Sequence, residues 1–413
     1  MTAQRMAAVD AQFYWASAKM PNDQFLLYAF DGETANLERV FEQIRLRARA
    51  CPDLAIRVAD GCSLTYPRWA PMAVGPELFV HHDLAEPSWQ VCLDAVVDLA
   101  AEQLDIRRTP WRMHVFTPVI GIPGVGGPGS VVVMQVAHAL GDGARASAMA
   151  AWLFGRAAPV AEVARTFAGF LPWRAGHASR THRQLVRDTS AGRLAPRAGS
   201  RPLLATNARP GSVRAIRTLV RKRAELPGPT VTVGVLAAVS TALSGLLGES
   251  ADLLGAEVPM AKPGVPLAHN HFANVVVGLY PRLGNDDRVQ RIAADLANGR
   301  RRLEHPAARS ADRAFASVPA PLVRWGVSQF NADVRPVQVA GNTVVSSVHR
   351  GAADLRFGEA KVVLTAGYPA LSPVMGLTHG VHGIGDTVAI SVHSAATALP
   401  DIDCYLRYLD AAL

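Results

Sequence analysis

Residues 130–155 read SVVVMQVAHALGDGARASAMAAWLFG, and they decide the fold and the function of this chain. The apolar run that begins at Val131 is typical of a strand buried on both faces. The strand ends at His138, and after the turn 139–141 Asp142 stands where a helix begins, so its carboxylate should cap that helix. Loops at the ends of core strands are common positions for catalytic groups. The pattern therefore predicts His138 as a catalytic residue on such a loop.

The segments around this stretch predict a mixed α/β protein. Apolar residues at helical spacing predict helices over 37–50, 90–104, 145–157, 213–223, 231–247 and 402–413. Strands are predicted over 111–120, 130–137, 273–279 and 388–393. Because helices and strands occur in both halves, we expect two α/β domains, over 1–170 and 210–413. The arginine-rich stretch 171–209 is predicted to be a basic connection, either a solvated linker or a surface for lipid headgroups.

The composition narrows the class of protein. The chain has 413 residues, 49% of them hydrophobic and 18% charged, which is enough for two cores. A net charge of +8 suits anionic headgroups, nucleic acid or the phosphates of coenzyme A, and no nucleic-acid-binding motif accompanies it. The scattered cysteines indicate neither disulfides nor a zinc site, and no secretory signal is visible, so we expect a cytoplasmic protein.

Two uncharged stretches, 117–141 and 226–248, could be mistaken for membrane spans. The first contains a Gly/Pro cluster that predicts the loop of a β-hairpin. The second has Pro227 and Pro229 at its start and several hydroxyl residues, which predicts a buried core helix. We therefore expect no integral membrane segment.

The motif His-x-x-x-Asp-Gly alone is also compatible with a purely structural loop, but the chain carries further segments of one family. The stretch resembles the HHxxxDG signature of the wax ester synthase/diacylglycerol acyltransferase (WS/DGAT) family, within the coenzyme A-dependent acyltransferase superfamily that includes nonribosomal condensation domains. The other segments that resemble this family, in order, are Val9–Ala11 with Phe13, Thr109–Val115, Asn270–Asn274 running to Pro281, and Ser346–Val348 with Ala398–Asp401. The resemblance thus spans nearly the whole chain.

The chain departs from the family pattern at three places. The first His of the motif is Ala137, the family's Asn-Asp pair is Thr232-Val233, and its SNVPGP segment is Ser346–Gly351. These departures bear on the substrates more than on the reaction.

The resemblance implies two chloramphenicol-acetyltransferase-like domains with the active site in a tunnel at their interface. His138 would act as general base, and Asp142 would hold the loop through an ion pair with an arginine. Gly141 and Gly143 would permit tight backbone geometry, and Asn274 and Ser346 would bind substrate. The chain contains no GxSxG elbow, which agrees with direct transfer without an acyl-enzyme.

The expected function is O-acyl transfer from acyl-CoA, as co-substrate, to a long-chain alcohol or diacylglycerol. An imidazole with a pKa near neutrality suits the removal of a proton from an alcohol. No metal and no tightly bound cofactor are expected, and the basic connection could give peripheral contact with the inner membrane face. Two alternatives stay open: the same fold acting on a glycolipid, polyketide or small metabolite, with an acyl carrier protein as a possible donor, and a non-catalytic lipid-binding homologue.

Overall fold

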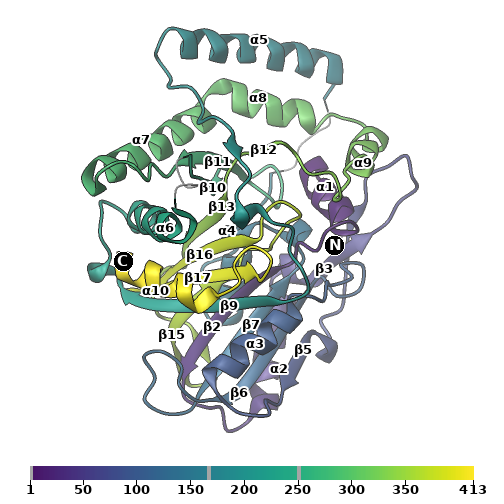
Figure 1. Cartoon of the computed structure of the whole chain (residues 1–413). Coiled ribbons are helices and arrows are strands. Elements are labelled where there is room, and N and C mark those ends of the chain that lie inside the picture. The colour runs from purple at the N-terminus through teal and green to yellow at the C-terminus, as the bar shows by residue number, and fades with distance from the viewer. Residues whose placement is uncertain (1–2, 165–168, 249–252) are drawn as a thin grey trace.

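The computed structural model describes residues 3–164, 169–248 and 253–413, and within these ranges the strands form two six-stranded sheets (Figure 1). The first sheet has the order β14-β15-β2-β7-β6-β5, and the second has the order β11-β10-β13-β16-β17-β9. Each half of the chain contains helices as well as strands, as the sequence predicts. Smaller sheets join β1 (Gln4–Arg5), β3 (Ile56–Ala59) and β4 (Arg68–Pro71), and pair β8 (Arg201–Pro202) with β12 (Gln338–Val339).

The first sheet is built mainly from the N-terminal half. Its strands are β2 (Gln24–Asp31), β5 (Phe79–His82), β6 (Trp111–Val119), β7 (Gly129–Val136), β14 (Arg356–Phe357) and β15 (Ala360–Gly367). Its helices are α1 (Ala8–Ser17), α2 (Leu37–Ala50), α3 (Trp89–Leu99) and α4 (Gly143–Leu153). Every residue of β7 is buried, because α1, α2 and α4 share a core with one face of the sheet while α3 packs against the other. This double cover explains the unbroken apolar run before His138.

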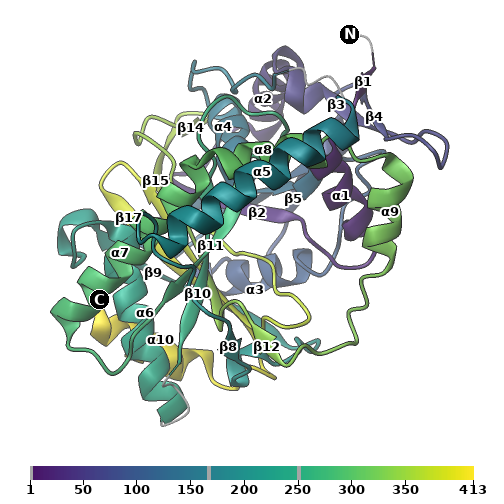
Figure 2. The ribbon, with the colours of Figure 1, turned by 90° about the horizontal axis from the view of Figure 1, so that it is seen from above.

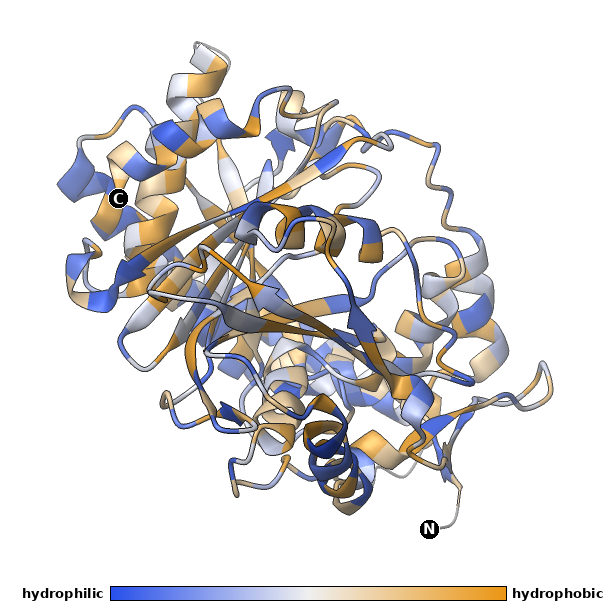
Figure 3. Cartoon of the chain, turned by 90° about the horizontal axis from the view of Figure 1, so that it is seen from below, coloured by the Kyte–Doolittle hydropathy of each residue, from blue (hydrophilic) through white to orange (hydrophobic). Residues whose placement is uncertain are grey.

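The second sheet belongs to the C-terminal half. Its strands are β9 (Arg214–Lys222), β10 (Gly255–Ala261), β11 (Phe272–Gly278), β13 (Thr343–His349), β16 (Leu377–Ile384) and β17 (Thr387–Ala395). Helices α6 (Val231–Leu247) and α10 (Ile402–Ala412) share its main core, and α7 (Asn285–Glu304) contributes to that core. The strands in Figure 3 are largely apolar, whereas the helices carry polar residues on one side.

The two halves interlock. Strands β14 and β15 come late in the sequence, yet β15 pairs antiparallel with β2 and so completes the first sheet. The connection 171–209 begins with α5 (Leu171–Ser190), which lies outermost against α8 (Pro306–Phe315) (Figures 1 and 2). Helix α9 (Ala320–Ser328) lies beside α1. Residues 356–367 therefore belong to the first sheet, although they lie within the segment 210–413 that was expected to form the second domain.

One predicted element is wrong. Residues 213–223, expected to be helical, form strand β9, which pairs with β17 along its whole length. Ile216, Leu219 and Val220 have helical spacing because the two faces of this strand pack against different helices, α3 on one side and α10 on the other. The predicted core helix 231–247 is confirmed as α6. None of the described helices is long and apolar enough to cross a membrane.

Candidate active site

His138 lies between the two halves of the molecule. It follows β7 as the first residue of a short 3-10 turn, His138–Leu140, at the end of the buried strand as the sequence predicts. The ring of Phe13 from α1 stacks on the imidazole with a centroid distance of 4.2 Å and an interplanar angle of 5°. The ring of Phe272 from β11 lies on the imidazole at 5.9 Å and 29°. Aromatic contacts from both halves therefore fix the plane of the imidazole.

The amide of Asn270 sets the tautomer of His138. Asn270 Oδ1 lies 2.9 Å from His138 Nδ1, and Asn270 Nδ2 donates to the His138 carbonyl at 2.9 Å and to Asp10 Oδ1 at 3.0 Å. Both partners of Nδ2 are acceptors, so the reverse orientation of the amide would place its oxygen against them. Oδ1 can only accept, so His138 carries its proton on Nδ1. None of the residues that the structure describes is hydrogen-bonded to Nε2, so its lone pair is left free for chemistry.

Burial keeps this imidazole neutral. Desolvation lowers the pKa of His138 below its usual 6.5, and the hydrogen bond that the ring donates to Asn270 and the charge of Asp142 oppose the shift only in part. A neutral ring with a free Nε2 is the form that a general base requires at neutral pH.

Asp10, on α1, holds the segment that carries Asn270. Its carboxylate accepts hydrogen bonds from the backbone N–H groups of His269 and Asn270, at 3.0 and 2.9 Å, as well as from the Asn270 amide. The side chain is fully buried, and desolvation raises its pKa to about 6 despite these donors. A charge from the first helix therefore positions a residue of the second half against His138.

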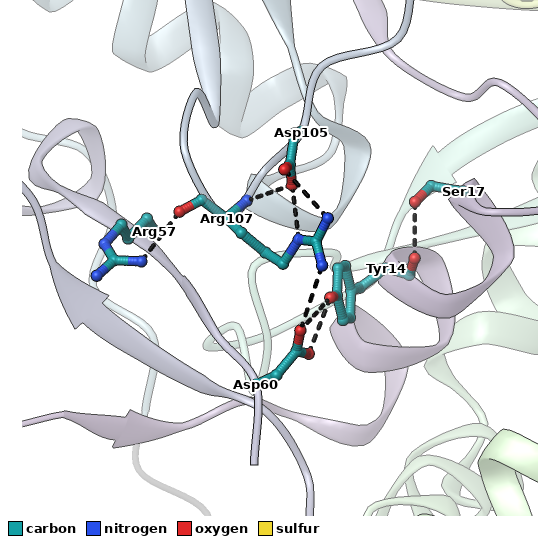
Figure 4. A network of polar contacts seen from close by, with 6 residues as sticks. All are labelled: Tyr14, Ser17, Arg57, Asp60, Asp105 and Arg107. Carbon is teal, nitrogen blue, oxygen red and sulfur yellow. Dashed lines mark hydrogen bonds and ion pairs between the residues drawn. The ribbon is translucent and has the colours of Figure 1, made fainter.

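Helix α1 is itself fixed by polar contacts at its outer side (Figure 4). The Tyr14 hydroxyl donates to Asp60 Oδ1 at 2.8 Å, and Arg107 bridges Asp105 and Asp60. Lys19 donates to the Ser328 carbonyl at the end of α9. These contacts orient the helix that supplies both Phe13 and Asp10.

Asp142 organises the loop through backbone groups. As the N-cap of α4 it accepts from the Arg145 N–H at 2.9 Å, which confirms the expected cap, and its other oxygen accepts from the His271 N–H at 2.8 Å. The expected ion pair with an arginine is not found among the described residues. Arg145 pairs instead with Asp53 at 2.6 Å. The two backbone donors satisfy the Asp142 carboxylate, which joins the His138 loop to β11.

The two glycines of the loop differ in how much space a side chain would have at each position. The Gly141 carbonyl accepts a hydrogen bond from the Gln24 amide, and a Cβ on Gly141 would lie 3.0 Å from two carbons of the Arg145 side chain. A Cβ on Gly143 would meet Gln24 and the Val348 side chain at 3.7 and 3.9 Å, which is ordinary contact. Of these two positions only Gly141 is crowded, and a side chain there would require Arg145 to shift.

The other two predicted substrate contacts are not joined to His138 by any contact seen here. Asn274 lies exposed on β11, and its amide donates to Glu257 Oε2 at 3.0 Å. Ser346 lies partly exposed on β13 beside Gly380 of β16. It shares a strand face with Val348, which approaches Gly143, because alternate residues point to the same side. Ser346 is therefore on the side of the sheet nearest the loop.

The sequence did not single out Asp10, Asn270, Phe13 or Phe272 as functional. All four lie in segments that resemble the family. The family motifs could therefore have pointed to these residues, whereas the spacing of apolar and polar residues could not. Within residues 3–164, 169–248 and 253–413, no group of three or more His, Cys, Asp or Glu side chains could hold a metal ion.

Comparisons with known proteins bear on the fold of the chain and on the family of its C-terminal part. Residues 269–413 match the family model described as the WS/DGAT C-terminal domain. No curated protein matches the chain by sequence. The whole fold is similar to that of a wax ester synthase/diacylglycerol acyltransferase from Marinobacter aquaeolei VT8, with 18% identity, a TM-score of 0.62 and coverage of 99% of this chain and 98% of that one.

Two condensation domains share the fold to a similar extent. The starter condensation domain of rhizomide synthetase RzmA, solved as a variant in complex with C8-CoA, has 13% identity and a TM-score of 0.61 over 100% of this chain and 94% of that one. The first condensation domain of the CDA synthetase has 14% identity and a TM-score of 0.61 over 100% and 96%. Residues 269–413 thus match the WS/DGAT C-terminal domain, and the chain over its full length has the two-domain fold that the Marinobacter acyltransferase and the condensation domains share.

Proposed function

We propose that the chain transfers a fatty-acyl group directly from acyl-CoA to the hydroxyl of a long-chain alcohol or diacylglycerol, with Nε2 of His138 as the general base. The observation that carries this proposal is the hydrogen bond between His138 Nδ1 and Asn270 Oδ1, because it leaves Nε2 unprotonated.

The reaction is an attack by the acceptor oxygen on the thioester carbonyl. His138 Nε2 takes the hydroxyl proton while the new C–O bond forms, and a tetrahedral intermediate results. The C–S bond then breaks, and the imidazolium returns the proton to the leaving coenzyme A thiolate. The products are the ester and free coenzyme A, which together contain all the atoms of the two substrates. No covalent acyl-enzyme forms.

The donor would approach from the side of β11. A cavity of about 490 Å³ lies there, and it is lined in part by His271, Lys262, Arg309 and Arg313. His271 precedes Phe272, which contacts the His138 ring. Lys262 is paired with Asp312, while the two arginines offer donors that suit the phosphates of coenzyme A.

For the acceptor side we propose Ser346, because its strand face turns toward Gly143. Its hydroxyl could accept from or donate to the attacking alcohol. Asn274 is proposed as a more distant contact, since its amide is already bound to Glu257.

Helix α5 is proposed to rest on an anionic membrane surface. Arg180, Arg183 and Arg187 are exposed along it, and the side chain of Trp173 is 66% exposed at its beginning. Basic residues next to an anionic surface each contribute about 1 kcal/mol. Such contact would bring the enzyme to acceptors that are dissolved in the lipid, from the cytoplasmic side.

The likeness to condensation domains supports a second candidate, in which the donor is an acyl carrier protein and the acceptor a polyketide, glycolipid or small metabolite. The purified protein should be incubated with acyl-CoAs and a loaded carrier protein, each with alcohols, diacylglycerol and polar acceptors, while thiol release and product mass are followed. Ester formed from acyl-CoA and a lipid alcohol supports the first candidate. Product from the carrier protein alone supports the second, and thiol release with no ester in any mixture would contradict both.

A further inference from the structure

Helix α9 is apolar on both of its sides. Ala320 and Val323 are buried on its inner side, where they join the hydrophobic core of the N-terminal half. On its outer side Leu322 and Trp325 lie three residues apart, and they are 55% and 63% exposed. A surface helix ordinarily carries charged or polar residues on the side away from the core. The outer side of α9 is therefore suited to an apolar partner.

The exposed apolar residues continue beyond the helix. Phe330, Val334 and Val337 follow α9 in the chain and are 46%, 67% and 90% exposed. Single exposed apolar residues are common on soluble proteins, whereas a concentration of them marks an interaction surface. The segment 322–337 has such a concentration.

The charges on and beside α9 are positive. Arg324 is exposed, and it is the only charged residue of the segment 314–332. Lys19, which follows α1, is also exposed, and its ammonium group donates to the carbonyls of Ser328 and Phe330 at 2.6 and 2.8 Å. Both acceptors are neutral, so the charge of Lys19 adds to that of Arg324.

Two acidic side chains of neighbouring segments are matched by arginines. Asp333 pairs with Arg209 at 2.5 Å, and Asp60 accepts from Tyr14 and lies 3.9 Å from Arg107. The outer side of α9 is thus apolar with a positive border. This is the pattern of a helix that lies in the interface of an anionic membrane, where tryptophan is favoured at the level of the headgroups.

Helix α9 is fixed at the end of the molecule that contains His138. It lies beside α1, whose Phe13 ring stacks on the His138 imidazole. The Tyr66 hydroxyl donates to the Val318 carbonyl, just before the helix, at 2.7 Å. A membrane that contacts α9 would therefore meet the end of the molecule that carries the catalytic loop.

The first turn of α5 lies at the same end of the molecule (Figures 1 and 2). Arg174 in that turn donates from Nη1 to the Arg313 carbonyl of α8 at 3.0 Å, and only residues 316–319 separate α8 from α9. Phe170 and Trp173, at the beginning of α5, are 73% and 66% exposed. One lipid surface could therefore contact both helices.

We propose that the outer side of α9 enters the headgroup boundary of an anionic membrane, with Leu322 and Trp325 against the acyl chains and Arg324 at the phosphates. This deepens the proposed function, in which the membrane contact belongs to α5 alone. A single weak signal seldom anchors a peripheral protein, so the charge of α5 and the apolar side of α9 are both required. Docking through α9 turns the His138 end of the molecule toward the lipid that holds the acceptor.

The test is the pelleting of the full chain with vesicles of equal parts phosphatidylcholine and phosphatidylglycerol, without acyl-CoA. Leu322→Ser/Trp325→Ser should weaken binding at least about tenfold, because it removes two large apolar side chains from the lipid and adds no charge. The matched control is Leu46→Ser/Ile120→Ser, at two residues of the N-terminal half that are each 55% exposed. Ile120 follows β6 at the end of the first sheet away from His138, and the control should bind as the unchanged protein does.

A second measurement reports the depth of Trp325. Phosphatidylcholine brominated in its acyl chains should quench the tryptophan fluorescence of the unchanged protein, and Trp325→Phe should remove a large part of this quenching. Unchanged vesicle binding by Leu322→Ser/Trp325→Ser, or quenching that Trp325→Phe leaves intact, would overturn the inference. So would a dimer in lipid-free solution that the double serine variant dissociates, because a second copy would then cover α9.

Two further measurements separate this inference from the proposed function. His138→Ala should bind the vesicles as the unchanged protein does, even where transfer is lost. With a short, water-soluble alcohol as acceptor, Leu322→Ser/Trp325→Ser should keep the transfer rate of the unchanged protein, and its rate should fall only with an alcohol embedded in vesicles. Absence of transfer in every mixture would contradict the proposed function and leave the vesicle result in force.

Discussion

Asn270 Oδ1 lies 2.9 Å from His138 Nδ1, although 132 residues separate the two in the sequence. Asn270 is held in turn by Asp10, 260 residues away from it. The protonation state of the proposed base thus depends on three segments that meet only in the folded chain: α1, the end of β7 and the start of β11.

Asn270 is a positioning residue, and its removal should lower kcat more than it changes KM. In Asn270→Ala the imidazole loses the acceptor that selects its tautomer, and we expect kcat to fall by about 10²-fold, within the usual range for impaired general base catalysis. Asn270→Ser, which keeps an acceptor oxygen, should recover part of the rate. Steady-state kinetics measure both constants, and equal losses in KM and kcat, or no rescue by serine, would contradict this role.

The Phe13 ring should set the acid limit of the pH–rate profile. Burial lowers the pKa of His138, so Phe13→Leu, which admits water, should raise that pKa toward 6.5. The base is then protonated at higher pH, and the acid limb of kcat/KM should move to higher pH. Phe41→Leu on α2 is the matched control. A limb that moves to lower pH in Phe13→Leu would show that burial does not govern this pKa.

Stability should fall as the pH is lowered from about 6.5 toward 4. Burial lowers the pKa of His114, His269 and His393 to about 4 and that of His379 to about 3. The unfolded chain binds protons on these rings below pH 6.5, so acid favours unfolding.

Two buried carboxyls act in the opposite direction. Burial raises the pKa of Asp10 and Asp23 to about 6, so protonation between pH 6 and 4 favours the folded state at these two positions. The histidines outnumber them, and the urea midpoint should be lower at pH 5 than at pH 7.5. An equal or higher midpoint at pH 5 would mean that the carboxyls dominate.

Membrane contact should depend on the arginines of α5. Replacing Arg180, Arg183 and Arg187 with alanine should weaken binding to phosphatidylglycerol vesicles by about 100-fold, since each contributes about 1 kcal/mol. High salt should detach the unchanged protein. The control replaces three exposed arginines of the first half, Arg39, Arg68 and Arg108. Pelleting of vesicles measures the bound fraction, and equal losses in both triple variants would assign the effect to overall charge alone.

The sequence predicted what local patterns encode. The buried strand before His138, the cap at Asp142 and the core helix at 231–247 follow from runs and spacings within a few residues. It failed at β9, where Ile216, Leu219 and Val220 imitate a helix because two different layers cover the strand. The residues that hold His138 in place could not be predicted from the spacing of residues in the sequence. Asp10, Asn270 and His138 are brought together only by tertiary packing. The arginine expected at Asp142 came from the family resemblance, and the structure has backbone N–H groups of Arg145 and His271 in its place.

The most direct test of the account is the rate of thiol release from a long-chain acyl-CoA in the presence of a fatty alcohol, compared between the unchanged protein, His138→Ala and the exposed control His182→Ala. The account predicts that His138→Ala loses at least about 10²-fold in rate while keeping its circular dichroism spectrum and unfolding midpoint, and that His182→Ala retains full activity. Thiol release and ester formation by His138→Ala at the rate of the unchanged protein would contradict the assignment of His138 as the general base.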